Sequence, residues 1–183
     1  MINLIHPFLA LSDPVDSDIL VVEGWLPDNA LIQSIHEFSN NNYKLLVITG
    51  GYQNKRDAVN ETFSIVEATA TKLLDYGLEE KYFIKVSAPP VKKHRTYNAA
   101  LALRNWIEEN GADVKAINIF TYGVHAKKSQ VLFKKVLGPF VRVGVISAVP
   151  SEYNPKYWFL SIEGIHWVLR DFLGYLYALL WKP

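Results

Sequence analysis

The chain has 183 residues, of which half are hydrophobic and 13% are aromatic, and we expect a single domain over residues 1–183 with a sizeable core rather than a disordered chain. The formal net charge of +1 lacks the basic excess of a nucleic-acid surface, so no nucleic-acid partner is expected. Because cysteine is absent, disulfide bonds, thiol catalysis and thiolate metal sites are excluded.

The N-terminal segment, MINLIHPFLALSDPVD, is a poor signal peptide, because it lacks a charged leading region and Pro7 breaks its apolar run. A cytoplasmic location is therefore the default expectation, with membrane association as an alternative that depends on the C-terminal segment.

Strand and helix patterns alternate along the rest of the chain. Apolar runs typical of buried strands lie at 19–22, 45–48, 82–86, 116–120 and 141–146. Four helices are expected. The first begins at Pro27 and Asp28, and the second follows a polar loop at 52–57. The third runs from an N-cap at Thr96 to Asn110, and the fourth covers 125–137. The second helix would place Phe63, Val66, Ala70 and Leu73 on one face, and Gly77 and Gly111 would end the second and third helices. We therefore predict a three-layer α/β/α sandwich, Rossmann-like, with a central mainly parallel sheet of about five strands.

Residues 162–181, IEGIHWVLRDFLGYLYALLW, are nearly long enough to span a bilayer. Polar residues interrupt the stretch at roughly helical spacing: Glu163, His166, Arg170 and Asp171. We favour a long aromatic-rich helix packed against the sheet. The alternative is an amphipathic helix that contacts a membrane surface or a second copy of the chain. A true membrane span is not expected.

Polar residues and glycines follow four of the expected strands. These segments are Glu23-Gly24-Trp25, Thr49-Gly50-Gly51, His94 to Asn98, and Tyr122 to His125. A parallel sheet brings all four to one edge, where strand carboxyl ends meet helix amino ends and ligands bind. The sequence therefore predicts a pocket at this edge.

His125 is the strongest single candidate. Residues three and four apart share a helix face, so His125, Lys128 and Ser129 would face one crevice just after the turn at Gly123. They would supply a titratable ring, a fixed cation and a hydroxyl, which indicates an anion site. His125 is interpreted as a general acid or base, or as a donor to the anion, and the structural alternative is a cap on its own helix.

Glu23 ends an apolar strand, where a carboxylate needs a partner. It is interpreted either as a general base or ligand contact, or as a structural partner of Arg95 or of a backbone amide. Arg95 suits recognition of phosphate or carboxylate. Thr96 is either a helix cap or a ligand contact, and Asn98 either orients the loop or binds the ligand.

Glycines complete the candidate ligand-binding set. Gly50 and Gly51 would let their turn adopt positive φ and bring backbone amides close to a ligand. Gly24 and Trp25 join the set through their place beside Glu23.

Several common motifs are absent. The chain has no GxGxxG after its first strand, no GK[ST] ending in GGYQNKR and no GxSxG. No histidine pair has metal-binding spacing and no carboxylate cluster suits a hard cation, so no metal site is expected.

Five segments in order resemble the ElyC/SanA/YdcF family of bacterial envelope-related proteins: EGWLPD, VITGG, RTYNAA, GVHAKKSQVLF and YNPKYWFLSIEGIHWVLRDFLGY. The resemblance implies a Rossmann-like fold with a pocket at the same strand ends, and links to envelope or surface-polysaccharide metabolism. The resemblance implies that the family's site positions correspond to Gly50, Gly51, Thr96, Asn98 and His125. It also implies S-adenosylmethionine as a candidate ligand.

The chain departs from the family pattern in three places. Glu23-Gly24-Trp25 stands where the family has glycines, and the spacing from Thr96 to Asn98 is one residue shorter than usual. Lys128 replaces an arginine, which keeps the charge but loses bidentate geometry.

The leading hypothesis is a protein that binds, and turns over, a small anionic metabolite that is phosphorylated or carboxylated and nucleotide- or sugar-like. The first alternative is a non-catalytic regulatory module for a nucleotide-like ligand. The second is a membrane-peripheral assembly factor that uses residues 162–181.

Overall fold

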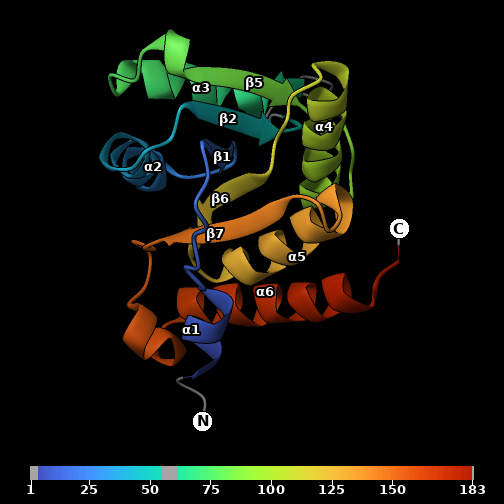
Figure 1. The fold of residues 1–183 in the computed structure, drawn as a ribbon. Coiled ribbons are helices and arrows are strands. Elements are labelled where there is room, and N and C mark those ends of the chain that lie inside the picture. The colour runs from blue at the N-terminus through green and yellow to red at the C-terminus, as the bar shows by residue number, and fades with distance from the viewer. Residues whose placement is uncertain (1–3, 55–61, 183) are drawn as a thin grey trace.

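The structure is a computed structural model that describes residues 4–54 and 62–182. Its centre is a five-stranded sheet with the order β5-β2-β1-β6-β7, in which every neighbouring pair is parallel (Figure 1). The strands are β1 (Ile19–Glu23), β2 (Leu45–Gly50), β5 (Phe83–Ser87), β6 (Ala116–Tyr122) and β7 (Arg142–Ala148). The predicted parallel sheet is therefore confirmed.

Helices cover both faces of this sheet. One core cluster joins the sheet to α2 (Asp28–Asn40) and α3 (Ile65–Asp75), and a second joins it to α4 (Arg95–Glu109) and α5 (Ala126–Leu137). Along β1, Val22 packs into the first cluster and Val21 into the second, as successive residues of a strand buried on both sides must. The predicted three-layer α/β/α sandwich is confirmed.

The strand order places a switch point at the middle of the sheet. The chain runs from β1 outward to β2 and β5, then returns to β6, which pairs directly with β1, before it continues to β7. Connections leave β1 and β6 in opposite directions, so a crevice remains between their carboxyl ends. Glu23 ends β1 and Tyr122 ends β6, and both therefore border this crevice.

Two predicted segments differ from the structure after β2. Residues 52–54 are not a loop but the strand β3 (Tyr52–Asn54), which pairs in antiparallel fashion with β4 (Thr62–Ser64); positions 55–57 of the predicted loop lie outside the described residues. Phe63 therefore belongs to β4 and not to the helix. The helix begins after Ser64, whose side chain accepts a hydrogen bond from the Glu67 amide.

Helix ends are the better-predicted boundaries. Gly77 and Gly111 have positive φ angles of 91° and 58° just beyond α3 and α4, as a left-handed helix end requires. The predicted N-cap at Thr96 is wrong, because α4 begins at Arg95 and the cap residue is His94. His94 has φ 55°, the one positive φ among the described non-glycine residues, and the chain turns into α4 there, two residues earlier than expected.

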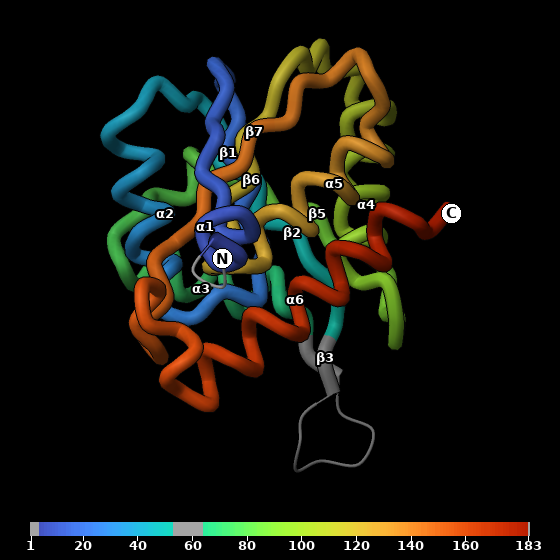
Figure 2. The backbone as a smooth tube through the Cα atoms, turned by 90° about the horizontal axis from the view of Figure 1, so that it is seen from below, coloured from blue at the N-terminus to red at the C-terminus, as the bar shows by residue number. Residues whose placement is uncertain are grey.

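The predicted position of the C-terminal helix is also wrong. α6 (Ile162–Leu180) packs mainly against α5, η4 (Pro155–Leu160), η3 (Gly123–His125) and α1 (Ile5–Leu9) rather than against the sheet. Figure 1 shows α6 running along α5, and Figure 2 shows it crossing the molecule beside α1. The remaining short helix is η2 (Glu80–Tyr82). Within 4–54 and 62–182, no helix combines the length and hydropathy needed to cross a bilayer.

Candidate functional site

A pocket of about 830 Å³ lies at the carboxyl edge of the sheet. Its walls come from the ends of β1 and β2, the start of α4, the start of α5 and one side of α6. Five basic side chains line it: Lys92, Lys93, Arg95, Lys128 and Arg170. No aspartate or glutamate is among its described lining residues, and the five cations outnumber Asp171, which contacts Lys128 and Arg170 from behind the lining, so the pocket favours an anion. Its volume is in the range of small-molecule sites.

His125 and Asp171 form a hydrogen-bonded pair in this pocket. The Nδ1 atom of His125 lies 2.7 Å from a carboxylate oxygen of Asp171, which comes from the middle of α6. Since a carboxylate only accepts hydrogen bonds, Nδ1 carries the proton and Nε2 is the ring atom left to exchange one. The pair thus fixes the tautomer and the orientation of the imidazole.

Asp171 is fully buried and stays ionised through its cationic neighbours. The Lys128 ammonium lies 2.8 Å from the oxygen that His125 uses, and the Arg170 guanidinium lies 2.7 Å from the other oxygen. Burial alone would raise the pKa of Asp171, but its contacts with His125 and Lys128 outweigh burial and hold that pKa well below 3.8. Lys128 reaches it across Gly174, where a Cβ atom would lie 3.0 Å from the Lys128 Cδ.

Glu23 stands on the other side of the His125 ring. Its Oε2 lies 4.0 Å from Nε2 of His125, and it accepts hydrogen bonds from the hydroxyls of Thr121 and Ser129, the latter at 3.0 Å. These hydroxyls, rather than Arg95 or a backbone amide, are its structural partners. The ring of His125 therefore lies between two buried carboxylates.

Thr96 places a hydroxyl near the exchangeable nitrogen. Its Oγ1 lies 3.5 Å from Nε2 of His125, and both residues line the pocket. Asp171, His125 and Thr96 thus stand in the order of an acid, a base and a hydroxyl, an order in which a histidine activates a nucleophile. A water molecule held at Thr96 would be activated by the same base.

Aromatic rings form much of the remaining wall. Trp25 meets His125 edge-on with ring centroids 4.9 Å apart, and it stacks on Trp167 at 6.5 Å. The Arg170 guanidinium lies 4.1 Å from the centroid of the Trp167 ring. At the far end, His94 stacks on Trp181 at 4.4 Å. These flat surfaces suit a planar ring or the apolar face of a sugar.

The structure brings many of the sequence candidates together in the lining and leaves the others outside it. Those that line the pocket are Trp25, Gly50, Gly51, Arg95, Thr96, His125 and Lys128. Those that do not are Glu23, Gly24, Asn98, Gly123 and Ser129.

Each candidate outside the lining has a supporting contact or conformation. The Gly24 amide donates to the Thr49 carbonyl, and Asn98 donates to the His94 carbonyl. Gly123 has φ 48°, which lets the chain turn sharply from β6 into η3 and so sets the position of His125.

The conformational role predicted for Gly50 and Gly51 is wrong, because neither has a positive φ. A Cβ atom on Gly50 would meet Ile65 and Val66 at 3.6 Å, which is ordinary contact. What remains is their place in the lining, where the missing side chains leave room for a ligand.

Asp171, Arg170 and Trp167 are among the site residues that the sequence patterns do not predict. The signal for Asp171 was its position as an acidic residue inside an aromatic and aliphatic helix, but nothing local links it to His125, which lies 46 positions away in the chain. Among the residues that the structure describes, no group of three or more histidine, aspartate or glutamate side chains could hold a metal ion.

No protein-family model matches the chain, and no curated protein matches it either. The function of the pocket is therefore inferred from its geometry.

Proposed function

We propose that the pocket binds a small anionic metabolite, phosphorylated or carboxylated, and that His125 exchanges a proton during its turnover. One observation carries the proposal: the hydrogen-bonded pair of His125 and Asp171 opens into a pocket with five basic lining side chains. The first feature suits proton transfer by an oriented imidazole, and the second suits a negatively charged ligand.

Two kinds of side chain would bind the ligand: cations that contact its negative charge and aromatic rings that stack on it. Arg95, in the first turn of α4, offers a planar guanidinium to a phosphate or carboxylate, and Lys128 adds a second positive charge. Trp25 and Trp167 offer flat surfaces for a ring. These features favour a nucleotide-like or sugar-like anion over inorganic phosphate alone.

Proton transfer is assigned to Nε2 of His125. Asp171 holds Nδ1 protonated, so Nε2 takes a proton from the Thr96 hydroxyl or from a water molecule beside it. The ring that takes this proton lies between the carboxylates of Asp171 and Glu23. Hydrolysis or group transfer at a phosphoryl or acyl centre is the reaction class that these roles support.

The resemblance to the ElyC/SanA/YdcF family supports a role of this metabolite in cell-envelope or surface-polysaccharide metabolism. It also supports the second candidate, a regulatory module that binds S-adenosylmethionine or a nucleotide without turning it over. The basic lining favours a ligand with net negative charge, and hence a phosphorylated metabolite, over S-adenosylmethionine, which carries a cationic sulfonium.

Binding is tested by replacing one exposed pocket cation. Small molecules released from the purified protein are identified by mass spectrometry, and binding of pyrophosphate and of adenosine 5′-monophosphate is measured by calorimetry. Arg95→Gln is expected to weaken binding of the anionic ligand about tenfold or more, as the loss of a charged hydrogen bond does.

The matched control is Arg104→Gln on the same helix, since Arg104 is exposed and lies outside the pocket lining. It should bind as the wild type does. No anion bound by the wild type, or equal affinities in both variants, would overturn the proposal. Binding that survives in His125→Asn, with turnover lost, separates the enzyme from the regulatory module.

A further inference from the structure

The outward face of α6 is apolar, whereas its inward face carries the charged and small residues of the site. Asp171, Gly174 and Ala178 face inward: Asp171 and Ala178 are buried, and Gly174 and Ala178 line the pocket. The outward face carries Ile162, Ile165, Leu169, Leu173, Leu176 and Leu180, all exposed and spaced by three or four residues. The exposed His166 lies among them. A surface helix of a protein surrounded by water shows the opposite arrangement.

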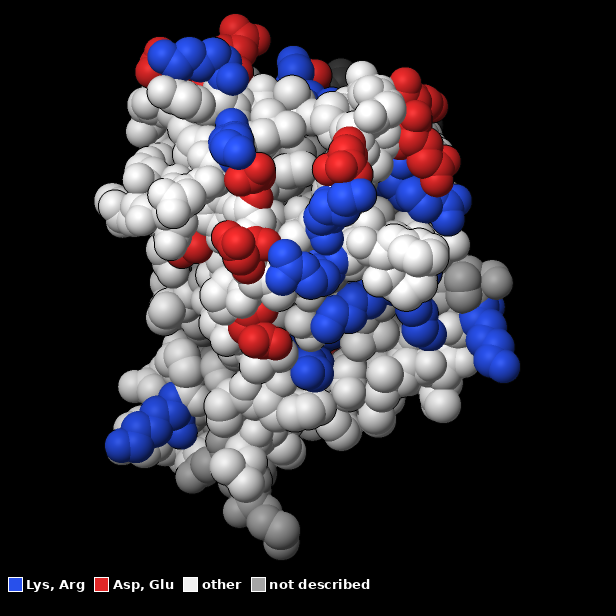
Figure 3. All heavy atoms as spheres, in the orientation of Figure 1, with Lys and Arg blue, Asp and Glu red and all other residues white. Residues whose placement is uncertain are grey.

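The apolar surface extends beyond α6 onto its neighbours. Phe8 of α1 packs edge-on against Tyr175 of α6 and remains 45% exposed, and Leu160 of η4 is 74% exposed just before α6 begins. Figure 3 shows few charged side chains on the part of the molecule below α5, in contrast to the many Lys, Arg, Asp and Glu side chains above it. We call the six outward residues of α6 with Phe8 and Leu160 the α6 face.

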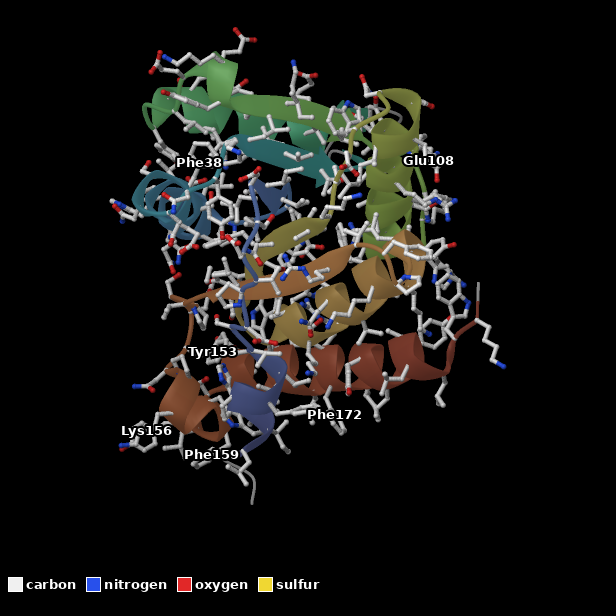
Figure 4. All side chains as sticks on the ribbon, in the orientation of Figure 1. Phe38, Glu108, Tyr153, Lys156, Phe159 and Phe172 are labelled. Carbon is white, nitrogen blue, oxygen red and sulfur yellow. The ribbon has the colours of Figure 1, made fainter. Side chains whose placement is uncertain are left out.

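Basic side chains border the α6 face. Lys156 is exposed in η4 near one end, where Figure 4 labels it, and Lys182 is exposed just past the other end. Lys127 lies 5.3 Å from the centroid of the Phe8 ring at the side. On α6 itself, Glu163 is exposed and Asp171 is buried. The charge around the face therefore complements an anionic surface.

We propose that the α6 face docks on the surface of a bilayer that contains anionic lipids, with α6 lying in the plane of the interface. An interfacial helix carries leucine and isoleucine on one face, lysines at its ends and tyrosines at its margin. Tyr157 and Tyr177 are exposed at the margin of the α6 face. A surface for a second protein would offer hydrogen-bonding groups and arginine among its aromatic residues, whereas His166 is the one polar side chain among the six aliphatic residues of this face. The proposal does not depend on what the pocket binds.

Flotation with lipid vesicles tests it. The wild-type protein is expected to float with vesicles of phosphatidylcholine and phosphatidylglycerol, more weakly with phosphatidylcholine alone, and less at high salt. Leu169→Gln with Leu173→Gln should lower the partition coefficient about tenfold or more, because two apolar side chains are no longer buried. Both leucines are exposed in the folded chain, so the variant should keep the wild-type circular dichroism and ligand binding.

The matched control is Leu74→Gln, which changes a leucine of similar exposure on α3, away from the α6 face. It should float as the wild type does. The proposal is overturned if the wild type does not float, if it binds neutral vesicles equally well, or if the double variant floats unchanged. A wild-type dimer in light scattering that the double variant dissociates, without any flotation, would assign the face to a second copy of the chain instead.

Discussion

Asp171 is the residue that joins the parts of the site. It accepts hydrogen bonds from His125, Lys128 and Arg170, so one carboxylate sets the histidine tautomer and holds two of the pocket cations in place. Because Asp171 is fully buried and the Lys128 side chain is only 19% exposed, its removal leaves Lys128 without its counter-charge in a poorly hydrated environment, whereas Arg170 keeps contact with water. The consequences should appear in stability as well as in the chemistry of His125.

We expect Asp171→Ala to lower the free energy of unfolding by about 3 kcal/mol, the usual cost of breaking a buried ion pair. Urea denaturation measures this change. The control is Asp113→Ala, which removes an exposed partner of Lys115 and should cost less than about 1 kcal/mol. Equal losses in the two variants would mean that the buried network contributes no more than a surface pair.

At the scale of elements, the alternation of buried strands and helices was readable because it is written in local hydrophobic patterns. The five strands and the ends of α3 and α4 follow from such patterns and from glycines placed for positive φ. The pairing of β3 with β4 could not be predicted from the sequence, because each strand has only three residues. Strands that short leave no periodicity to detect.

The pocket residues between Gly123 and Ser129 were predictable, because this segment lies within a few residues of one strand end. The remaining site residues come from α6, whose position depends on packing against α5 and not on its own sequence pattern. His125 could therefore be predicted as a site residue, whereas its partner Asp171 could not. Tertiary contacts between distant segments decide such pairs.

The short helix α1 should make stability depend on pH through His6. Its Nε2 lies 3.1 Å from the Tyr153 hydroxyl, and burial lowers the pKa of His6 below 6.5. The unfolded chain then binds a proton at a higher pH than the folded chain does. The contribution of His6 to the free energy of unfolding is therefore fully present above the unfolded pKa of 6.5, and it is lost as the pH falls below that value.

We expect the free energy of unfolding of the wild type to fall from about pH 8 to about pH 5.5, and to fall less in His6→Gln. Denaturant titrations at a series of pH values measure both. His36→Gln, which changes an exposed histidine of α2, should retain the wild-type slope. A His6 variant with that same slope would contradict the assignment.

At the scale of the whole molecule, one helix serves two surfaces. The inward side of α6 supplies Arg170 to the pocket lining and Asp171 to His125 behind it, and the outward side forms the α6 face. The sheet contributes the switch point between β1 and β6, where Glu23 and His125 meet. The proposed anion site thus depends on the sandwich for its floor and on α6 for its wall.

Nuclear magnetic resonance of the histidine side chains would show whether an anion binds beside His125. The five histidines are assigned by single substitutions, and adenosine 5′-monophosphate or the co-purified anion is titrated into the wild-type protein. The account predicts that the imidazole resonances of His125 shift in a saturable manner, while those of His36, outside the pocket lining, do not. Saturable binding of an anion that leaves the His125 resonances unchanged would contradict it.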